Sequence, residues 1–437
     1  MTTDQIKDDS GKKLTIRILI GMVAGIAIGV LLKLISTHAV GDSGQALISD
    51  WLTNGIFQFV GRGFVNLLQV IVIPLVLVSL ISGTAAMEDI AKVGRIGLKT
   101  LILYLFTTAL AISFAMGAAL IFKPGAGFPQ DDTISFTAKE APPLVQVFIN
   151  IIPKNVFDAM ASGNMLPIIV FAVLIGLSIT MAGEAGRRIL SFVNDLNEIV
   201  MKLVWIVMQV APYGVFALIA RTFATEGFSA FVPLLKYFVL VIAVLIFHAA
   251  VTYPTILKLL SGLSPVTFLK NMREVQLFAF STASSNATIP ISLRTVEQRL
   301  GVNKSVASFS IPLGATINMD GTAIMQGVAT IFIAQVYGID LSVGQLLTVI
   351  LTATLASIGT AGVPGVGLIM LAMVLQQVGL PVAGIGLIIG IDRLLDMIRT
   401  AVNVTGDCAV SCIVAKSEGE LDRSVFEDDD TRVEHPA

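Results

Sequence analysis

Long apolar runs, separated by short polar segments, dominate the first 260 residues of the chain. Runs long enough to cross a hydrocarbon layer of about 30 Å fall at residues 14–35, 55–87, 97–122, 144–182, 189–223 and 231–260. The first run is longer than the apolar core of a signal peptide and lacks an obvious cleavage site. The pattern therefore predicts six membrane-spanning helices in this part of the chain.

Two clusters of small and polar residues interrupt the apolar pattern beyond residue 263. Residues 281–290 read STASSNATIP and residues 356–365 read ASIGTAGVPG. Lipid-facing helices cannot contain such segments without leaving backbone groups unpaired, so we predict the tips of two re-entrant hairpins, each followed by a longer helix. Interrupted segments at corresponding positions of two repeats indicate a transporter's binding site, because the ends of half-helices offer free N–H and C=O groups.

The composition indicates that lipid surrounds most of the chain. Of its 437 residues 55% are hydrophobic and 13% charged, and the mean hydropathy of +0.87 is too high for a soluble domain of this length. The net charge of −2 indicates neither a nucleic-acid nor an acidic partner, since charges cluster at the ends and in short loops. Basic residues fall in alternate connections, which predicts cytoplasmic termini. The predicted cytoplasmic set comprises Lys7, Lys12, Lys13, Arg17, Lys92, Arg95, Lys99, Arg187, Arg188, Lys258, Lys270, Arg273, Lys416 and Arg423.

An aspartate follows the first predicted hairpin, in the segment Asn318-Met-Asp-Gly-Thr322. Gly321 is expected to weaken the helix where Asp320 lies near the middle of the membrane. A charged residue there costs about 2.5–3.5 kcal/mol on insertion scales unless something compensates it. Sodium would do so, because hard cations bind carboxylate, hydroxyl and carbonyl oxygens. Capping of a helix break is the alternative role for Asp320.

The last span, at residues 386–415, carries polar residues at three- and four-residue steps, which places them on one helical stripe. Arg399 offers a planar fork that can bind a carboxylate through two parallel hydrogen bonds, which favours a substrate with a side-chain carboxylate. An internal ladder of salt bridges is the alternative, and Asp396 with Arg399 would fit it. The stripe consists of Asp392, Asp396, Arg399, Asn403 and Asp407.

With these motifs, the chain resembles the dicarboxylate/amino acid:cation symporter family, which contains archaeal aspartate transporters and eukaryotic excitatory amino acid transporters. The resemblance extends from the first span to about Asp422. It implies an all-α integral membrane protein with eight transmembrane helices and two re-entrant hairpins in inverted repeats. It also implies a homotrimer that carries L-aspartate or L-glutamate with sodium by an elevator motion. The motifs are the serine-rich first tip, residues 318–322, Gly359-Thr-Ala-Gly-Val-Pro-Gly365 and Arg399-Thr-Ala-Val-Asn-Val-Thr-Gly-Asp407.

The resemblance also divides the chain into domains. Residues 1–13 and 417–437 would be cytoplasmic tails. Residues 14–260 would form mainly the scaffold and trimer contacts, with spans 3 and 6 belonging to the transport domain. Residues 261–416, which contain both hairpins and spans 7 and 8, would form the core of that domain. Short ends and a brief connection at 123–143 lead us to expect a prokaryotic plasma membrane.

Family resemblance assigns a role to each matching position. Asp396 would bind the substrate's amino group and Arg399 its side-chain carboxylate. Thr400 and Asn403 would bind the α-carboxylate, and residues 363–367 would act as the extracellular gate. The implied substrate site is Ser284, Ser285, Thr322, Val363, Gly367, Asp396, Arg399, Thr400 and Asn403. Three implied sodium sites comprise Gly314, Asn318, Asn403 and Asp407; Thr316, Met319, Ser357, Ile358 and Thr360; and Tyr104, Thr107, Thr108, Asn318 and Asp320.

Two departures from the family pattern concern coupling and affinity. Gln326 stands where proton-coupled eukaryotic members carry glutamate, so the chain resembles the sodium-only prokaryotic branch. A second arginine, which the family places on the first hairpin or the last span, is replaced by Ala283 or Met397. We expect that Arg393 does not fully replace it.

Other functions remain open on the sequence. A C4-dicarboxylate carrier of the same family would keep Arg399 but would need Asp396 less, and an anion channel would belong to another class. A membrane enzyme fits least, because His248 stands alone on an apolar span. Cys408 and Cys412 share a helical face and could bind a metal, but without a nearby partner they fit small core residues better.

The missing arginine gives a test of substrate preference. We expect Ala283→Arg to alter the affinity for aspartate relative to glutamate, because the new guanidinium would add positive charge at the hairpin tip. Competition of the two unlabelled amino acids against labelled aspartate measures this ratio. Equal ratios in the variant and the natural chain would contradict the expectation.

Overall fold

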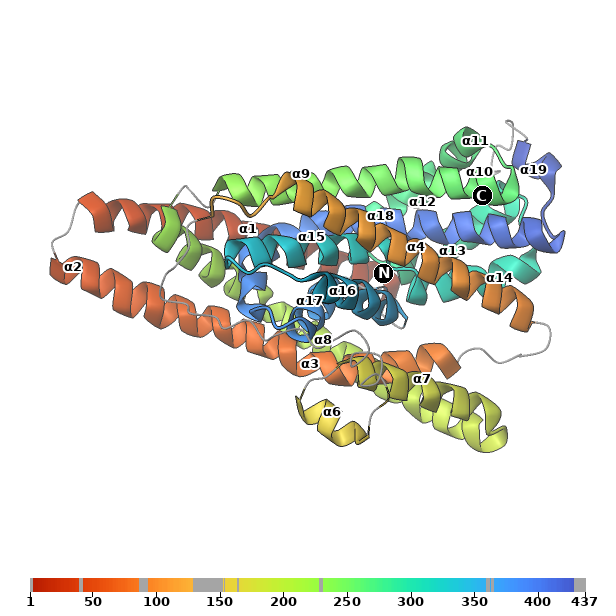
Figure 1. Cartoon of the computed structure of the whole chain (residues 1–437), viewed down its shortest axis with the longest axis horizontal. Helices are drawn as coiled ribbons and strands as arrows, with labels where there is room; N and C mark the ends of the chain where they lie inside the picture. The colour runs from red at the N-terminus through yellow and green to blue at the C-terminus, as the bar shows by residue number, and fades with distance from the viewer. Residues whose placement is uncertain are drawn as a thin grey trace.

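The computed structural model describes residues 3–38, 42–85, 93–128, 152, 154–162, 165–227, 231–358, 362 and 365–427. Regular structure in these ranges is helical, apart from an isolated antiparallel bridge between Val302 and Leu421. The long helices run side by side along the axis of an elongated bundle (Figure 1). This architecture agrees with the all-helical membrane protein expected from the apolar pattern.

One group of helices packs along α8, and glycines explain how closely α1 approaches it. A Cβ on Gly21 would lie 2.5 Å from the carbonyl oxygen of Pro212, and one on Gly29 would lie 2.6 Å from that of Ala220. Small residues at four-residue steps let the backbones of membrane helices approach in this way. The group consists of α1 (Thr3–His38), α2 (Asp42–Ala46), η1 (Leu47–Phe57), α3 (Gln58–Ala85), α7 (Met165–Met181) and α8 (Glu184–Glu226).

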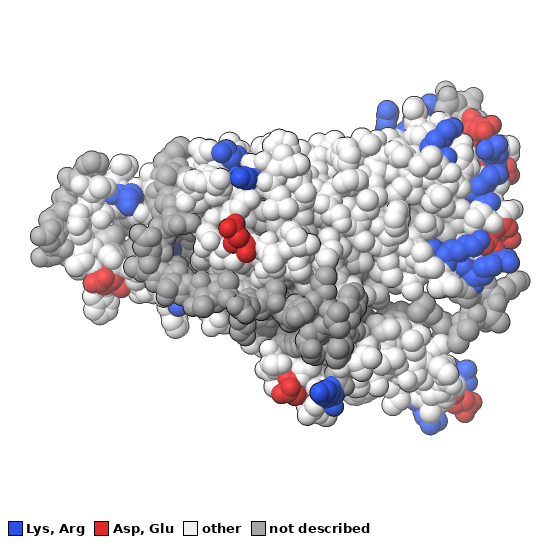
Figure 2. All heavy atoms as spheres, viewed as in Figure 1, with Lys and Arg blue, Asp and Glu red and all other residues white. Residues whose placement is uncertain are grey.

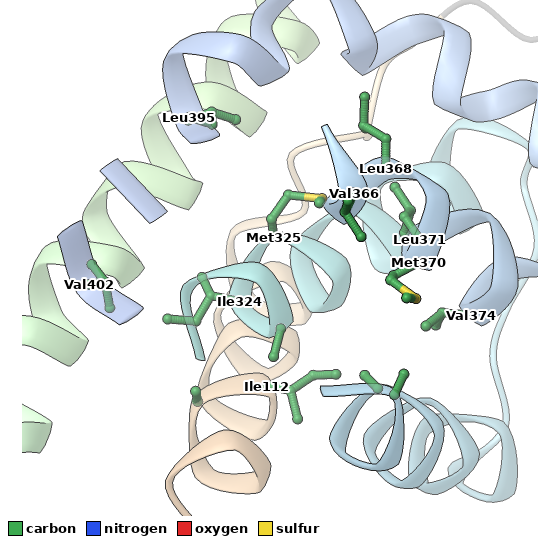
Figure 3. Packing of buried hydrophobic residues seen from close by; sticks show 14 of the residues in the cluster. Ile112, Ile324, Met325, Val366, Leu368, Met370, Leu371, Val374, Leu395 and Val402 are labelled. Carbon is green, nitrogen blue, oxygen red and sulfur yellow. The ribbon is translucent and has the colours of Figure 1, made fainter. Parts of the chain in front are cut away.

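A second group surrounds α15, which is buried at every position except Gln335. A helix that is covered on all sides belongs at the centre of a bundle. Figure 3 shows side chains from α4, α15, α17 and α18 in the apolar core around it. The helices of this group, besides the hairpins, are α4 (Val93–Phe122), α9 (Phe231–Phe247), η3 (His248–Thr252), α10 (Tyr253–Ser261), α11 (Pro265–Asn271), α14 (Lys304–Ile317), α15 (Asp320–Val336), η4 (Val382–Gly384), α18 (Ile385–Glu418) and α19 (Arg423–Glu427).

Two pairs of helices are too short to cross a membrane, which needs about 20 residues. In the first pair, α12 (Arg273–Thr282) and α13 (Ser285–Gln298) have 10 and 14 residues. In the second pair, α16 (Val343–Ser357) and α17 (Val366–Gln377) have 15 and 12. Ala283 takes a left-handed conformation (φ 49°) at the first tip. The lengths agree with the two predicted hairpins.

The helix after the first hairpin is broken two residues before the predicted weak point. Asn318 (φ −85°, ψ 88°) and Met319 (φ −112°, ψ 42°) separate α14 from α15, and Gly321 lies inside the first turn of α15. Gly321 instead allows α15 to pack closely on α18, because a Cβ at this position would lie 2.5 Å from the carbonyl oxygen of Arg399. The break leaves the first N–H groups of α15 free, and that of Gly321 donates to Asn403 Oδ1 at 2.7 Å.

The predicted span at 144–182 lies only partly within the described residues, where it forms two helices, α6 (Val156–Ser162) and α7 (Met165–Met181), rather than one. Asn155 Oδ1 accepts from the N–H of Phe157 (2.9 Å) and caps the start of α6. The other five predicted spans are confirmed by helices long and apolar enough to cross a membrane. In the described ranges these are Ile16–Thr37, Gly44–Ser82, Arg95–Phe122, Glu184–Thr225 and Phe231–Ser261.

On the face in Figure 2, charged side chains are most numerous at the end of the bundle where α18 and α19 end, and they are sparse elsewhere. At one end Glu418, on α18, pairs with two basic residues of α4: Lys99 Nζ at 2.5 Å and Arg95 Nη2 at 2.6 Å. The hydrogen bond from Lys99, followed by that from Arg95, lowers the pKa of Glu418 below its usual value. The distribution is typical of a protein whose long axis crosses a membrane.

Close packing of α15 on α18 can be tested at Gly321. We expect Gly321→Ala to lower the free energy of unfolding by about 1–3 kcal/mol, the usual cost of overpacking, because the new methyl group meets rigid backbone. Thermal unfolding of the purified protein in detergent measures the loss. Gly117→Ala on α4 is the control, since a Cβ there meets nothing within 4 Å. Equal melting temperatures for the two variants would contradict the packing argument.

Candidate functional site

A small closed cavity lies where both hairpins meet α15 and α18. Its volume is about 20 Å³, room for one water molecule. A larger hollow of about 360 Å³ lies along α3, but it contains none of the predicted site residues. The small cavity is lined by Ala283, Ser285, Met319, Thr322, Gly362, Val366, Gly367, Asp396, Thr400 and Asn403. Of these, Ala283 and Gly362 were not among the predicted site residues, whereas Val366 lies in the predicted gate at 363–367.

Arg399 is fully buried behind Gly367 and Asp396, which line this cavity, and is bound by two carboxylates of its own helix. Its Nη1 lies 2.7 Å from Asp392 Oδ1, and its Nη2 lies 2.8 Å from Asp396 Oδ1. The second oxygen of Asp396 accepts from Arg393 Nη1 (3.4 Å) and from the N–H of Gly365 (3.3 Å). Both aspartates therefore form ion pairs with arginine. The internal ladder of salt bridges, which the sequence left open as an alternative, is present in the structure.

Gly367 lies beside the Arg399 guanidinium. A Cβ on this residue would lie 3.3 Å from Arg399 Nη2 and 3.3 Å from Thr322 Cγ2. Any larger residue would have to displace these neighbours, so glycine lets α17 pack close to the guanidinium, which is itself fully buried. The guanidinium could bind a carboxylate from outside the protein only if the internal aspartates released it.

Asp320 and Asp407 are buried without such compensation. Asp320 accepts from Thr108 Oγ1 (2.5 Å), Tyr253 Oη (2.8 Å) and His248 Nε2 (3.1 Å). Asp407 Oδ1 accepts from Asn318 Nδ2 at 2.8 Å. Neither carboxylate forms an ion pair with a lysine or arginine in the part of the chain described. Hydrogen bonds orient the two groups, but neither lysine nor arginine of the described residues would compensate a negative charge on them in this region of low dielectric.

Oxygen atoms collect around Asp407. Gly314 lies against it, because a Cβ there would be 2.5 Å from both Asp407 Oδ1 and Tyr104 Oη. The Oδ1 of Asn318 is buried and has no hydrogen-bond partner among the described residues, although its Nδ2 also donates to Asn403 O at 2.9 Å. An unpartnered acceptor beside an unpaired carboxylate fits a hard cation. Gly314, Asn318, Asn403 and Asp407 are thus brought together as predicted.

The other predicted residues divide into three groups. Near Asp320, Thr108 Oγ1 donates to the carboxylate at 2.5 Å, and Thr107 and Thr108 also donate to the carbonyl oxygen of Tyr104 on their own helix (3.1 and 2.8 Å). The hydroxyls of Thr316 and Ser357 likewise bond to their own helices, at Pro312 O and Thr354 O. Thr360 and Val363 lie outside the described residues. The structure therefore brings together the residues of the first predicted cation site and joins Thr108 to Asp320 in the third, while the second remains a prediction.

Ser284 does not line the cavity but joins the two hairpin tips. Its hydroxyl donates to the carbonyl oxygen of Gly362 at 2.7 Å, and the N–H of Asn286 bonds to the same oxygen at 3.2 Å. A Cβ on Gly362 would lie 2.7 Å from Ala315 O, so glycine permits this close contact. Ser285, by contrast, lines the cavity as predicted.

The interpretation of His248 as an isolated packing residue is wrong, and Tyr253 was missed. Both side chains are buried against Asp320. The five-residue spacing in the sequence gave no signal, because an α-helix would point the two residues in different directions. Pro254, directly after Tyr253, was the available hint that the helix is irregular at this point.

Helical hairpins too short to span, a broken helix at their junction and buried charges facing a closed cavity are features of secondary transporters. The fold and the site thus define a membrane transporter. The chain belongs to the sodium:dicarboxylate symporter family, whose model matches residues 14–417. It is accordingly a transport protein and not an enzyme.

Similarity to known transporters extends over nearly the whole chain. It is 38% identical over 413 residues to the proton/sodium-glutamate symport protein of Bacillus caldotenax, which covers 92% of this chain and 94% of the relative. It is 36% identical over 419 residues to the proton/glutamate-aspartate symporter of Escherichia coli K12, covering 93% of each. The C4-dicarboxylate transport protein of Bacillus subtilis 168 is 31% identical over 421 residues, covering 94% of this chain and 95% of the relative.

Gly314 provides a test of the proposed cation pocket beside Asp407. We expect Gly314→Ala to raise the sodium concentration needed for half-maximal binding about tenfold, because a methyl group would occupy the space between Asp407 and Tyr104. Overpacking of about 1–3 kcal/mol corresponds to that factor. Calorimetric titration of the purified protein with sodium chloride measures the change. Gly63→Ala on α3, where a Cβ meets nothing within 4 Å, is the control, and equal sodium affinity in both variants would contradict a cation site there.

Proposed function

We propose that this protein is a sodium-coupled symporter of acidic amino acids, L-aspartate or L-glutamate. The observation that carries the proposal is the difference between two pairs of buried aspartates. Asp392 and Asp396 are neutralised by arginine, whereas Asp320 and Asp407 are paired with neither lysine nor arginine in the described chain. The names of the relatives from B. caldotenax and E. coli, which include glutamate and, in the first, sodium, support the same function.

Charge balance supports three sodium ions for each amino acid. Among the described residues His248 Nδ1 has no hydrogen-bond partner, so a second proton on the ring would find no acceptor there, and the proposal counts the imidazole as neutral. Two uncompensated carboxylates and one monoanionic amino acid make three negative charges, which three sodium ions would neutralise. Two net positive charges would then move inward, and the membrane potential would contribute about 4.6 kcal/mol per 100 mV.

An exchange of partners at Arg399 would bind the substrate. The side-chain carboxylate of the amino acid would replace Asp396 on the guanidinium, beside Gly367. The freed Asp396 would bind the ammonium group, so one ion pair would be replaced by two and neither charge would lose its partner. The α-carboxylate would bind Thr400 and Asn403, with Ser285 and Thr322 completing the wall.

Alternating access would follow from motion of one helix group against the other. The group around α15, with α4, α9, α10, α18 and both hairpins, would be the transport domain, and the group along α8 would be the scaffold. Hairpin 2, which includes residues 363–367, would be the extracellular gate. We further propose a homotrimer in a prokaryotic plasma membrane with both termini cytoplasmic, as the alternating basic connections indicate.

A C4-dicarboxylate carrier is the second candidate, favoured by the similarity to the B. subtilis protein of that name. Such a substrate lacks the ammonium group that would replace Arg399 as a partner of Asp396, so that carboxylate would keep only Arg393 and the N–H of Gly365. Burial of a carboxylate with fewer partners is costly, which favours the amino acid.

Uptake into proteoliposomes tests the proposal. With sodium outside and an inside-negative potential, we expect labelled aspartate to accumulate, to saturate with sodium, and to be displaced by glutamate but not by succinate or serine. Replacing external sodium by choline removes the driving ion at constant ionic strength and should reduce uptake to background. Accumulation in choline would contradict sodium coupling.

Two further outcomes separate the alternatives. Displacement by succinate would support the dicarboxylate carrier, and flux without sodium-dependent saturation would indicate a channel. Arg399→Cys should abolish uptake of aspartate, because the fork is lost, and unchanged uptake in this variant would exclude Arg399 from the substrate site.

A further inference from the structure

A short π-helical segment, η3, interrupts the helix between α9 and α10. Its last hydrogen bond runs from the N–H of Tyr253 to the carbonyl oxygen of His248, five residues back. Pro254 follows at the start of α10 and has no N–H, and in a regular α-helix its ring would collide with the carbonyl group four residues earlier. An extra residue in the turn relieves that conflict, and π-bulges of this kind occur frequently at functional sites.

The π turn brings two side chains to the same face of the helix. In an α-helix, residues five apart point roughly 140° away from each other, at 3.6 residues per turn. Here the rings of His248 and Tyr253 stack edge to face, with centroids 4.5 Å apart. Both rings contact the same atom, Asp320 Oδ2. A regular helix would direct only one of them there.

Tyr253 Oη lies close to Asp320 and also close to Asn318, the residue that donates to Asp407. It donates to Asp320 at 2.8 Å. A Cβ on Gly406 would lie 2.3 Å from this oxygen and 2.5 Å from Asn318 Nδ2, and that same Nδ2 donates to Asp407. The tyrosine is buried (1% exposed), so water does not share its hydroxyl.

The hydrogen bonds on Asp320 leave room for one more ligand. A carboxylate offers about four lone-pair positions. Thr108 occupies one on Oδ1, and His248 and Tyr253 occupy two on Oδ2. The remaining position is on Oδ1, the oxygen that faces Thr108 on α4. Because two hydrogen bonds hold Oδ2 in place, Oδ1 is the carboxylate oxygen that remains available to bind a cation.

We propose that Tyr253, brought into place by the π turn, is a positioning residue for the cation site at Asp320. It holds one carboxylate oxygen so that the other is presented to an alkali cation. The inference rests on the proposed sodium coupling and adds to it a residue outside the predicted ligand set. His248 assists from the same turn, and Tyr253 differs from it in also lying against the Asn318 amide.

The test replaces the hydroxyl alone. Tyr253→Phe should raise the sodium concentration for half-maximal binding about tenfold or more, the effect of losing a hydrogen bond to a charged group. Sodium chloride is titrated into the purified full-length protein by calorimetry, without amino acid and with choline chloride keeping the ionic strength constant. The melting temperature of the sodium-free protein is measured in parallel.

Tyr237→Phe is the matched control. Tyr237 is also fully buried, lies on the preceding helix α9, and its hydroxyl has no partner among the described residues. Unchanged sodium affinity in this variant, with weaker sodium affinity in Tyr253→Phe, supports the proposal. A lower sodium-free melting temperature in Tyr253→Phe with unchanged sodium affinity would show a merely structural role and overturn it. If the natural chain binds no sodium, both the proposed function and this inference fail.

Discussion

The guanidinium of Arg399 lies out of contact with water between two carboxylates of its own helix, and much of the surrounding architecture follows from balancing buried charge. An isolated ion at this depth would cost several kcal/mol, whereas a guanidinium bound by Asp392 and Asp396 is neutralised by paired hydrogen bonds. In the described part of the chain neither lysine nor arginine meets this requirement at Asp320 and Asp407, which accept hydrogen bonds from threonine, tyrosine, histidine and asparagine side chains. Under the proposed function, the first region would be a locally neutral compartment for an anion and the second a compartment for cations.

Broken helices make these compartments possible. A continuous helix uses all its interior backbone groups, so it has none to offer a ligand or a capping side chain. The break at Asn318 and Met319 frees the start of α15, and α18 caps it through Asn403. The π turn before Tyr253 is a milder irregularity with a similar effect, because it changes the direction of side chains without ending the helix.

Glycines make the compartments compact. Gly321 allows α15 to touch the backbone of α18, Gly314 admits the oxygens of Asp407 and Tyr104, and Gly367 lets α17 pack close to Arg399. The contacts at Gly321 and Gly314 are closer than a β-carbon would permit, and the one at Gly367 would be tight. A cavity of only about 20 Å³ remains between the hairpin tips, so the proposed substrate would enter only if the tips moved apart.

The sequence by itself determined the membrane class, five of the six early spans, the two short hairpins and the polar stripe on α18. Each of these depends on local composition or on regular helical spacing, which a sequence displays directly. Tertiary structure alone decided which buried charges neutralise each other and which do not. It also decided that α7 begins a separate helix, that Gly321 serves packing, and that His248 and Tyr253 meet at Asp320. These features depend on contacts between distant segments and on an irregular turn, and neither leaves a periodic signal in the sequence.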